Sequence, residues 1–122
     1  MEVDVRKVED VILVDLEGRL VAGTGAEHLK EVFNEILGAG WSRIVLNLSG
    51  VSKIDSAGIG ELVDGVRLGQ RFEASVKLLH VKGQVREVLA LSQLLPILDV
   101  YYSEEDAIAA FDAPDEDATP DA

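Results

Sequence analysis

Short apolar runs alternate along this chain with segments of helical periodicity, and this alternation limits the folds available to it. The runs Val11–Leu16 and Arg43–Leu48 are dominated by apolar residues, which is typical of strands covered on both faces in a parallel sheet. Residues 76–81 and 97–102 are two further strand candidates. Val3–Val8 alternates apolar and charged residues and is expected to form an exposed edge strand.

Between these runs the apolar residues repeat at steps of three and four, which indicates amphipathic helices. The first stripe runs from Ala26 to Leu37, and Thr24 with Glu27 predicts a capping box at its start. The remaining stripes cover residues 59–66, residues 85–89 ahead of Pro96, and residues 103–111. Two strands followed by alternating helices and strands predict an α/β domain, with a mostly parallel mixed sheet of about five strands and four helices.

Composition indicates one cytoplasmic domain followed by a tail. The 122 residues fit one domain, and 48% are hydrophobic, so a core can form without disulfides or a structural metal. No apolar run approaches the roughly 20 residues that span a bilayer, and the charged start is unlike a signal peptide. Residues 112–122 hold five acids, no base and no core residue. We therefore expect a domain over residues 1–111 and a disordered acidic tail over residues 112–122.

Charge and cysteine content exclude several classes of function. The net charge of −12 would repel nucleic acid and anionic lipid, so neither direct nucleic-acid binding nor membrane insertion is expected. The absence of cysteine removes disulfides and thiolate chemistry. The acids show no metal-ligand spacing, and no phosphate-binding loop is present.

The most informative segment follows the second buried run and opens the second helix. In parallel α/β folds this junction lies at the carboxyl ends of the strands, where ligands and partners bind. The serine and aspartate here could be ordinary helix caps, and the glycines could allow close packing. However, two glycines in an early helical turn cost roughly 1 kcal/mol each relative to Ala, which favours a need for access to the backbone. Ser56 would be exposed at the positive end of a helix dipole, where a phosphate is favoured. The predicted partner-binding residues are Asp55, Ser56, Ala57, Gly58 and Gly60.

The hexad Asp55-Ser-Ala-Gly-Ile-Gly60, after Ile44–Leu48, resembles the signature of the STAS family. From Val3 to Phe111 the chain is most similar to the bacterial anti-sigma factor antagonists of that family. The resemblance implies that Ser56 is phosphorylated by an ATP-dependent anti-sigma factor, a serine kinase of the histidine-kinase-like fold. It also implies that the unphosphorylated protein binds this kinase and frees a sigma factor, and that a serine phosphatase reverses the modification. ATP and magnesium would then belong to the kinase, and this chain would need no cofactor.

The chain departs from the family pattern close to the predicted site. In the family the turn Leu16–Gly18 often leads to an aspartate near the phosphorylated serine, but Val21–Ala22 stands there in this chain. Gly23 and Gly25 lengthen that loop by what looks like one residue. Ala57 replaces a second serine found in some members, so Ser56 is the only hydroxyl in the hexad.

Catalysis is not expected from this sequence. A serine hydrolase needs a base, and the two histidines, His28 and His80, are predicted on the polar side of a helix and within a strand. No nucleophile elbow is present. A phosphate-receiver domain needs an aspartate at a strand end, whereas the apolar run ends at Leu48, well before Asp55. The remaining alternative is non-enzymatic: a scaffold of a stress-sensing complex, or a regulatory subunit of a membrane transport system.

Overall fold

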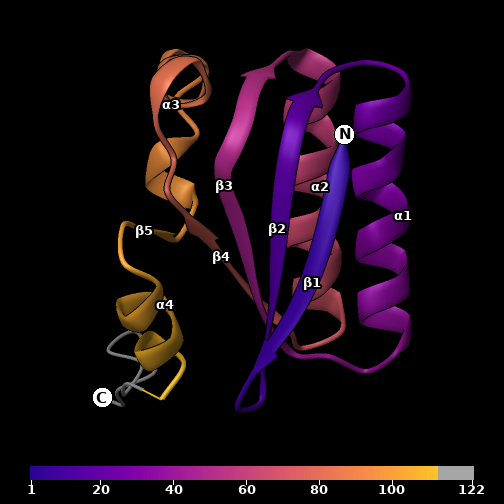
Figure 1. Ribbon diagram of the computed structural model, residues 1–122, viewed down its shortest axis with the longest axis vertical. Helices are drawn as coiled ribbons and strands as arrows, with labels where there is room; N and C mark the ends of the chain where they lie inside the picture. Colours follow the sequence, from indigo (N-terminus) through magenta and orange to yellow (C-terminus); the bar gives the residue numbers. More distant parts are fainter. Residues whose placement is uncertain (113–122) are drawn as a thin grey trace.

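The computed structural model describes residues 1–112 and contains the predicted mixed sheet with four helices (Figure 1). In chain order the elements are β1 (Glu2–Val8), β2 (Val11–Leu20), α1 (Thr24–Gly38), β3 (Arg43–Ile54), α2 (Ser56–Arg71), β4 (Ser75–Leu79), α3 (Gly83–Leu91), the 3₁₀ turn η1 (Leu95–Ile97), β5 (Val100–Tyr101) and α4 (Glu104–Ala110). The strands lie in the order β1-β2-β3-β4-β5, with β1 antiparallel to β2 and all other pairs parallel. The α/β fold class is therefore confirmed.

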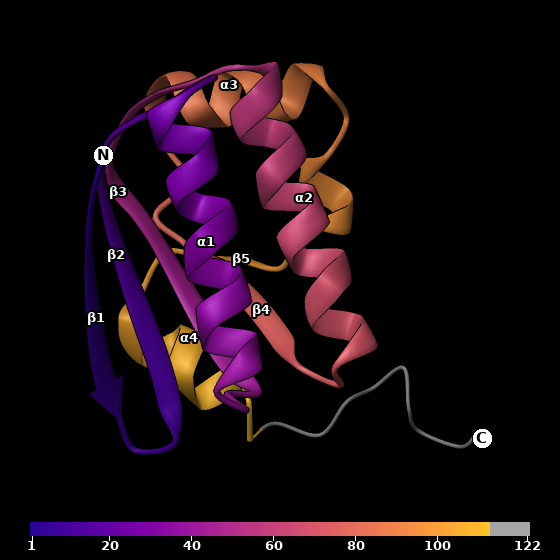
Figure 2. The ribbon, with the colours of Figure 1, turned by 90° about the vertical axis from the view of Figure 1, so that its right-hand side faces the viewer.

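Two cores form on opposite faces of the sheet. The larger core lies under α1 and α2, and the alternate residues of β2 that enter it are Ile12, Val14 and Leu16. The smaller core lies under α4 and comprises Val11, Leu13, Val45, Leu79 and Ala107. Helix α3 lies at the end of the sheet where β2 and β3 finish and where α1 and α2 begin (Figures 1 and 2). Within residues 1–112 no helix combines the length and apolarity needed to cross a bilayer.

The two central strands are longer than their apolar runs. β2 continues through Gly18, which has φ of +119° at an irregular point in the pairing, so the predicted turn at Leu16–Gly18 is a bulge within a strand. β3 continues to Ile54 because its backbone stays paired with β2 up to Leu20. Asp55 therefore follows a strand directly, and the spacing argument against a receiver domain was wrong.

The later strands are shorter than predicted. β4 ends at Leu79, and His80, which we expected inside this strand, follows it with φ of +59°. β5 has only two residues, because Pro96 lies in the 3₁₀ turn that precedes it.

Asp112, which we assigned to the tail, is described and its carboxylate accepts a 2.7 Å bond from Arg43. The rest of the predicted tail, residues 113–122, lies outside the described residues.

The predicted helix starts had mixed outcomes. Ser103, the first residue of the predicted helical segment 103–111, caps α4, with its hydroxyl oxygen accepting from the backbone N–H of Asp106 at 3.3 Å. The predicted capping box of α1 is wrong, because Thr24 is the first helical residue and Gly23 occupies the N-cap without a side-chain bond. A glycine suits this cap because its φ of +92° strains any side chain.

Helix α2 packs through a face made largely of glycine. Its buried residues are Gly58, Leu62, Gly65 and Gly69, at steps of four, three and four. A Cβ on Gly65 would lie 2.1 Å from the ring of Phe33 in α1, so the absence of a side chain lets the two helices approach. Ile59 and Val63, which we predicted in the apolar stripe, are only half-buried on the flank of this face.

Candidate functional site

Asp55 joins the start of α2 to the loop between β2 and α1. It is the N-cap of α2, and one carboxylate oxygen accepts from the backbone N–H of Gly58 at 3.0 Å. The other oxygen accepts from the backbone N–H of Ala22, also at 3.0 Å. These N–H groups, Ala22 first and then Gly58, hold the pKa of Asp55 below its usual range. Both carboxylate oxygens are therefore engaged in holding the junction together.

Ser56 is the first residue of α2 and is exposed. Within residues 1–112 its side chain makes no hydrogen bond to another protein group, because the capping role belongs to Asp55. The structure therefore does not support the alternative in which Ser56 is only a helix cap, because Asp55 fills that role. An exposed hydroxyl on a fixed backbone is geometrically suited to modification by another protein.

The two glycines of the hexad have different surroundings. A Cβ on Gly58 would lie 2.0 Å from the carbonyl oxygen of Leu20 and 2.9 Å from the side chain of Ile54, so this buried glycine serves packing. A Cβ on Gly60 would meet nothing within 4 Å. Gly60 lies one helical turn after Ser56 on the same side of α2. The packing explanation therefore accounts for Gly58 but not for Gly60.

The loop before α1 lies against this junction. Ala22, at the position where the family pattern often has an aspartate, contributes a backbone N–H to Asp55. Gly25 does not lengthen the loop as predicted, because it lies in the first turn of α1. A Cβ on Gly25 would lie 2.2 Å from the carbonyl oxygen of Arg19, so α1, like α2, begins in close contact with the end of β2.

The sequence analysis did not identify Gln84, which binds the last residue of β3. Its amide oxygen accepts from the backbone N–H of Ile54 at 2.9 Å, and its amide nitrogen donates to the Ile54 carbonyl at 3.1 Å. The pairing of β3 with β4 ends at Asn47 and Leu79, so Gln84 takes the place of a strand neighbour at the far end of β3. Gln84 and Ile54 are 30 residues apart, and no sequence pattern links them. The sequence shows only that Gln84 is a polar residue beside the apolar stripe of α3.

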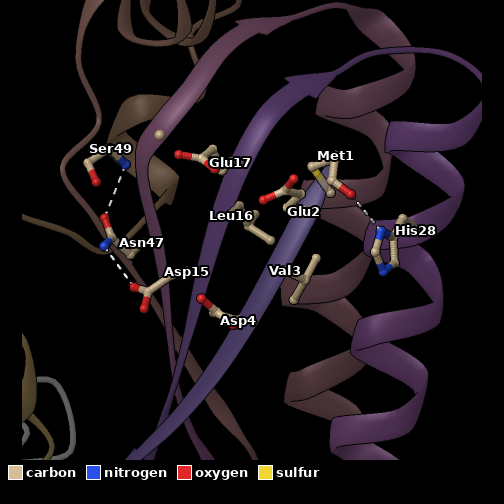
Figure 3. Close-up of a pocket in the computed structure, with 11 residues that line it drawn as sticks. Met1, Glu2, Val3, Asp4, Asp15, Leu16, Glu17, His28, Asn47 and Ser49 are labelled. Atoms are coloured by element: carbon tan, nitrogen blue, oxygen red, sulfur yellow. Dashed lines mark hydrogen bonds between the residues drawn. The ribbon is translucent and has the colours of Figure 1, made fainter.

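The two histidines lie elsewhere. A ring nitrogen of His28 is 3.2 Å from the carbonyl oxygen of Met1 (Figure 3). Neither His28 nor His80 has a hydrogen bond to Ser56 among the described residues. The pocket beside Met1, of about 570 Å³, is lined mainly by β1, β2 and β3 and contains none of the predicted site residues. Within the part of the chain that the structure describes, no group of three or more His, Cys, Asp or Glu residues is placed to hold a metal.

Comparison with known proteins identifies the class to which this fold and junction belong. A profile of the STAS domain matches residues 2–107, so the chain belongs to the STAS domain family. BtrV of Bordetella bronchiseptica, named as a candidate anti-sigma factor antagonist, is 30% identical over 111 residues, which cover 91% of this chain and 95% of BtrV.

Solved structures agree with this assignment. The crystal structure of a candidate anti-sigma factor antagonist from Thermotoga maritima has a TM-score of 0.84 and 27% identity, and the match covers 91% of this chain and 95% of that one. The anti-sigma factor antagonist SpoIIAA in its unphosphorylated form has a TM-score of 0.70 and 19% identity, over 93% of this chain and all of SpoIIAA. At that identity the likeness to SpoIIAA shows the fold alone.

Proposed function

We propose that this protein is an anti-sigma factor antagonist controlled by phosphorylation of Ser56. The unphosphorylated form binds an anti-sigma factor that is also a serine kinase, and this binding frees a sigma factor. Phosphorylation of Ser56 by the same kinase ends the binding, and a serine phosphatase restores it. The chain acts by binding in the cytoplasm rather than by catalysis, and ATP with magnesium is held by the kinase.

The exposed hydroxyl of Ser56, which no described residue binds, beside the engaged carboxylate of Asp55 carries this proposal. Asp55 fixes the backbone of the junction, so the hydroxyl is presented at a defined place without being used by the fold. The names of the relatives support the antagonist class. SpoIIAA, which shares the fold, has also been solved in a phosphorylated form.

The partner would contact Asp55, Ser56, Ala57 and Gly60, while Gly58 shapes the surface from beneath. A phosphate adds about −1.5 to −2 charges at one point. A charge left unpaired in a protein interface costs several kcal/mol, and each 1.4 kcal/mol changes affinity about tenfold. One phosphate on Ser56 could therefore change affinity by orders of magnitude with no change of fold.

The test begins with the serine kinases of histidine-kinase-like fold encoded in the source genome. Each is purified and incubated with ATP and this protein, and phosphate is located by intact mass and peptide mapping. We expect one kinase to modify Ser56, with no phosphate on Ser56→Ala. Ser52→Ala is the matched control, because Ser52 is also exposed, four residues earlier on β3, and should leave phosphorylation intact.

Binding to that kinase is measured next. Ser56→Ala should bind whether or not ATP is present, and Ser56→Asp should bind at least tenfold more weakly. Phosphorylation that persists in Ser56→Ala, or equal binding by the two variants, would remove Ser56 from the mechanism. The result would then favour the scaffold or transport-subunit alternative.

A further inference from the structure

We propose that four basic side chains near Ser56, none of them ion-paired within residues 1–112, form the surface that attracts an acidic face of the kinase, and that phosphorylation weakens binding by offsetting their charge. We call these residues the basic rim: Arg19, Lys53, Lys82 and Arg86. The inference rests on the proposed function and adds the chemistry by which the partner is recognised.

The fold brings the basic rim together at one end of the sheet. Arg19 and Lys53 are register partners near the ends of β2 and β3, so their side chains lie on the same face of the sheet. Lys82 is the N-cap of α3, and Arg86 lies one turn further on. Both belong to the helix that Gln84 attaches to Ile54, directly before Asp55. Figures 1 and 2 both show α3 at the end of the sheet where α2 begins.

The charge balance of the three segments that carry the rim is opposite to that of the whole molecule. The chain has 23 acids and 11 bases. The three segments that meet at this end, residues 18–22, 49–60 and 79–86, hold four bases and one acid, Asp55. Asp55 already accepts two backbone N–H groups, and the next acids, Glu17, Glu61 and Glu87, flank these segments on β2, α2 and α3.

The basic rim is exposed, and none of its four residues takes part in an ion pair among the described residues. Arg86 does donate to the hydroxyl of Tyr102, a neutral group that leaves its charge unpaired. By contrast, Arg6, Arg43 and Lys77 each pair with carboxylates. Basic side chains without counter-charges on an otherwise acidic surface complement an acidic patch on a partner.

This arrangement gives phosphorylation a second effect. Within these three segments an excess of three positive charges falls to about 1–1.5 when a phosphate of about −1.5 to −2 charges is added at Ser56. An attraction of this kind acts over about 8–10 Å at ordinary salt and is screened as salt rises. A purely steric effect of the phosphate would not depend on salt.

The first experiment compares Ser56→Asp with Ser56→Asn, which has nearly the same shape and no charge. Affinity for the kinase that phosphorylates Ser56 is measured at 50 and 500 mM NaCl by titration calorimetry. We expect Ser56→Asp to bind at least tenfold more weakly than Ser56→Asn at low salt, with the ratio falling toward one at high salt. Equal weakening by the two variants, or a ratio independent of salt, would overturn the proposal while leaving phosphorylation of Ser56 intact.

The second experiment neutralises three of the four rim residues. The triple variant Lys53→Gln, Lys82→Gln, Arg86→Gln should lose at least tenfold in affinity at low salt and less at high salt. The matched control is Lys7→Gln, Lys30→Gln, Arg71→Gln, which removes the same charge from exposed positions on β1, α1 and the far end of α2. Equal losses in the two triple variants would mean that total charge matters and not the rim.

A third measurement needs no kinase. A decaglutamate peptide is titrated into the ¹⁵N-labelled protein, and the shifted amide signals are mapped. We expect the shifts to gather at the rim residues and to disappear in the rim variant. Shifts spread over the surface, or none, would overturn the proposal even if no kinase for Ser56 had been found.

Discussion

Gly58 and Gly60 stand two residues apart in α2, yet the space around them differs. The backbone of β2 passes so close to Gly58 that any side chain there would overlap the carbonyl of Leu20. Gly60 faces open space. A glycine inside a helix costs roughly 1 kcal/mol of stability relative to Ala. Since no packing contact requires Gly60, this glycine lowers the stability of the folded protein without a structural reason.

We predict opposite effects of alanine at these two positions. Gly58→Ala should lower the free energy of unfolding by about 1–3 kcal/mol, because the backbone of β2 or α2 must move. Gly60→Ala should raise it by up to about 1 kcal/mol and at the same time weaken kinase binding, since a side chain would then stand one turn from Ser56. Urea unfolding and the kinase affinity of each variant provide the check. Unchanged affinity in Gly60→Ala would mean that this glycine does not face the partner.

At this scale the sequence predicted the start of α2 correctly but not the structural role of each residue there. The order Asp55-Ser56 before an amphipathic stripe was enough to place a helix start and a candidate phosphorylation site. It could not separate Gly58 from Gly60, because the difference lies in the position of Leu20, far away in the sequence. The same reason hid Gln84, whose partner is the backbone of Ile54.

At the scale of elements, helices α1 and α2 approach each other through Gly65 and Phe33. The ring of Phe33 is only 2% exposed and has little room to turn away. The stripe of Ile59 to Val66 predicted α2 and its buried Leu62, but it missed the buried glycines of this face, because glycines carry no apolar signal. The ends of β2 and β3 were missed for a related reason: backbone pairing continues there beneath polar and exposed side chains such as Ser52 and Lys53.

We predict that Gly65→Ala lowers the free energy of unfolding by about 1–3 kcal/mol, because its Cβ would lie 2.1–2.4 Å from three ring carbons of Phe33. Phe33→Leu alone should also destabilise, but the two changes together should cost less than their sum, since the smaller side chain leaves space for the methyl group. Gly38→Ala at the end of α1, where a Cβ meets nothing within 4 Å, is the control and should not destabilise. Additive losses in the double variant would show that the two helices do not meet at this pair.

At the scale of the whole molecule, the side chain of Arg6 connects three distant parts of the chain. From the edge strand β1 it donates to Asp15 in β2 at 2.6 Å and to Glu104 in α4 at 2.9 Å. Asn47 in β3 adds a 2.8 Å bond to Asp15. The composition gave the net charge of −12 but could not show that acids and bases are distributed so unevenly, with Arg6 ion-paired and the basic rim without an ion pair among the described residues.

This network makes stability depend on pH in a defined direction. The hydrogen bonds from Arg6 chiefly, and from Asn47, hold the pKa of Asp15 below its ordinary value of 3.8. A carboxylate whose pKa is lower in the folded state contributes stability that is present above its unfolded pKa and is lost as pH falls through the folded one. We therefore predict a melting temperature that declines as pH falls below about 4.

Asp15→Asn should make that decline shallower and should lower stability at pH 7 by no more than about 1 kcal/mol, since the pair is partly exposed and screened by solvent. The control is Asp4→Asn, which removes an equal charge from the register partner of Asp15 on β1, where no bond to Arg6 is made. Melting temperatures of the three proteins are recorded between pH 2 and 7. If Asp15→Asn and Asp4→Asn change the acid decline to the same extent, the pairing of Asp15 with Arg6 contributes nothing and net charge alone governs stability in acid.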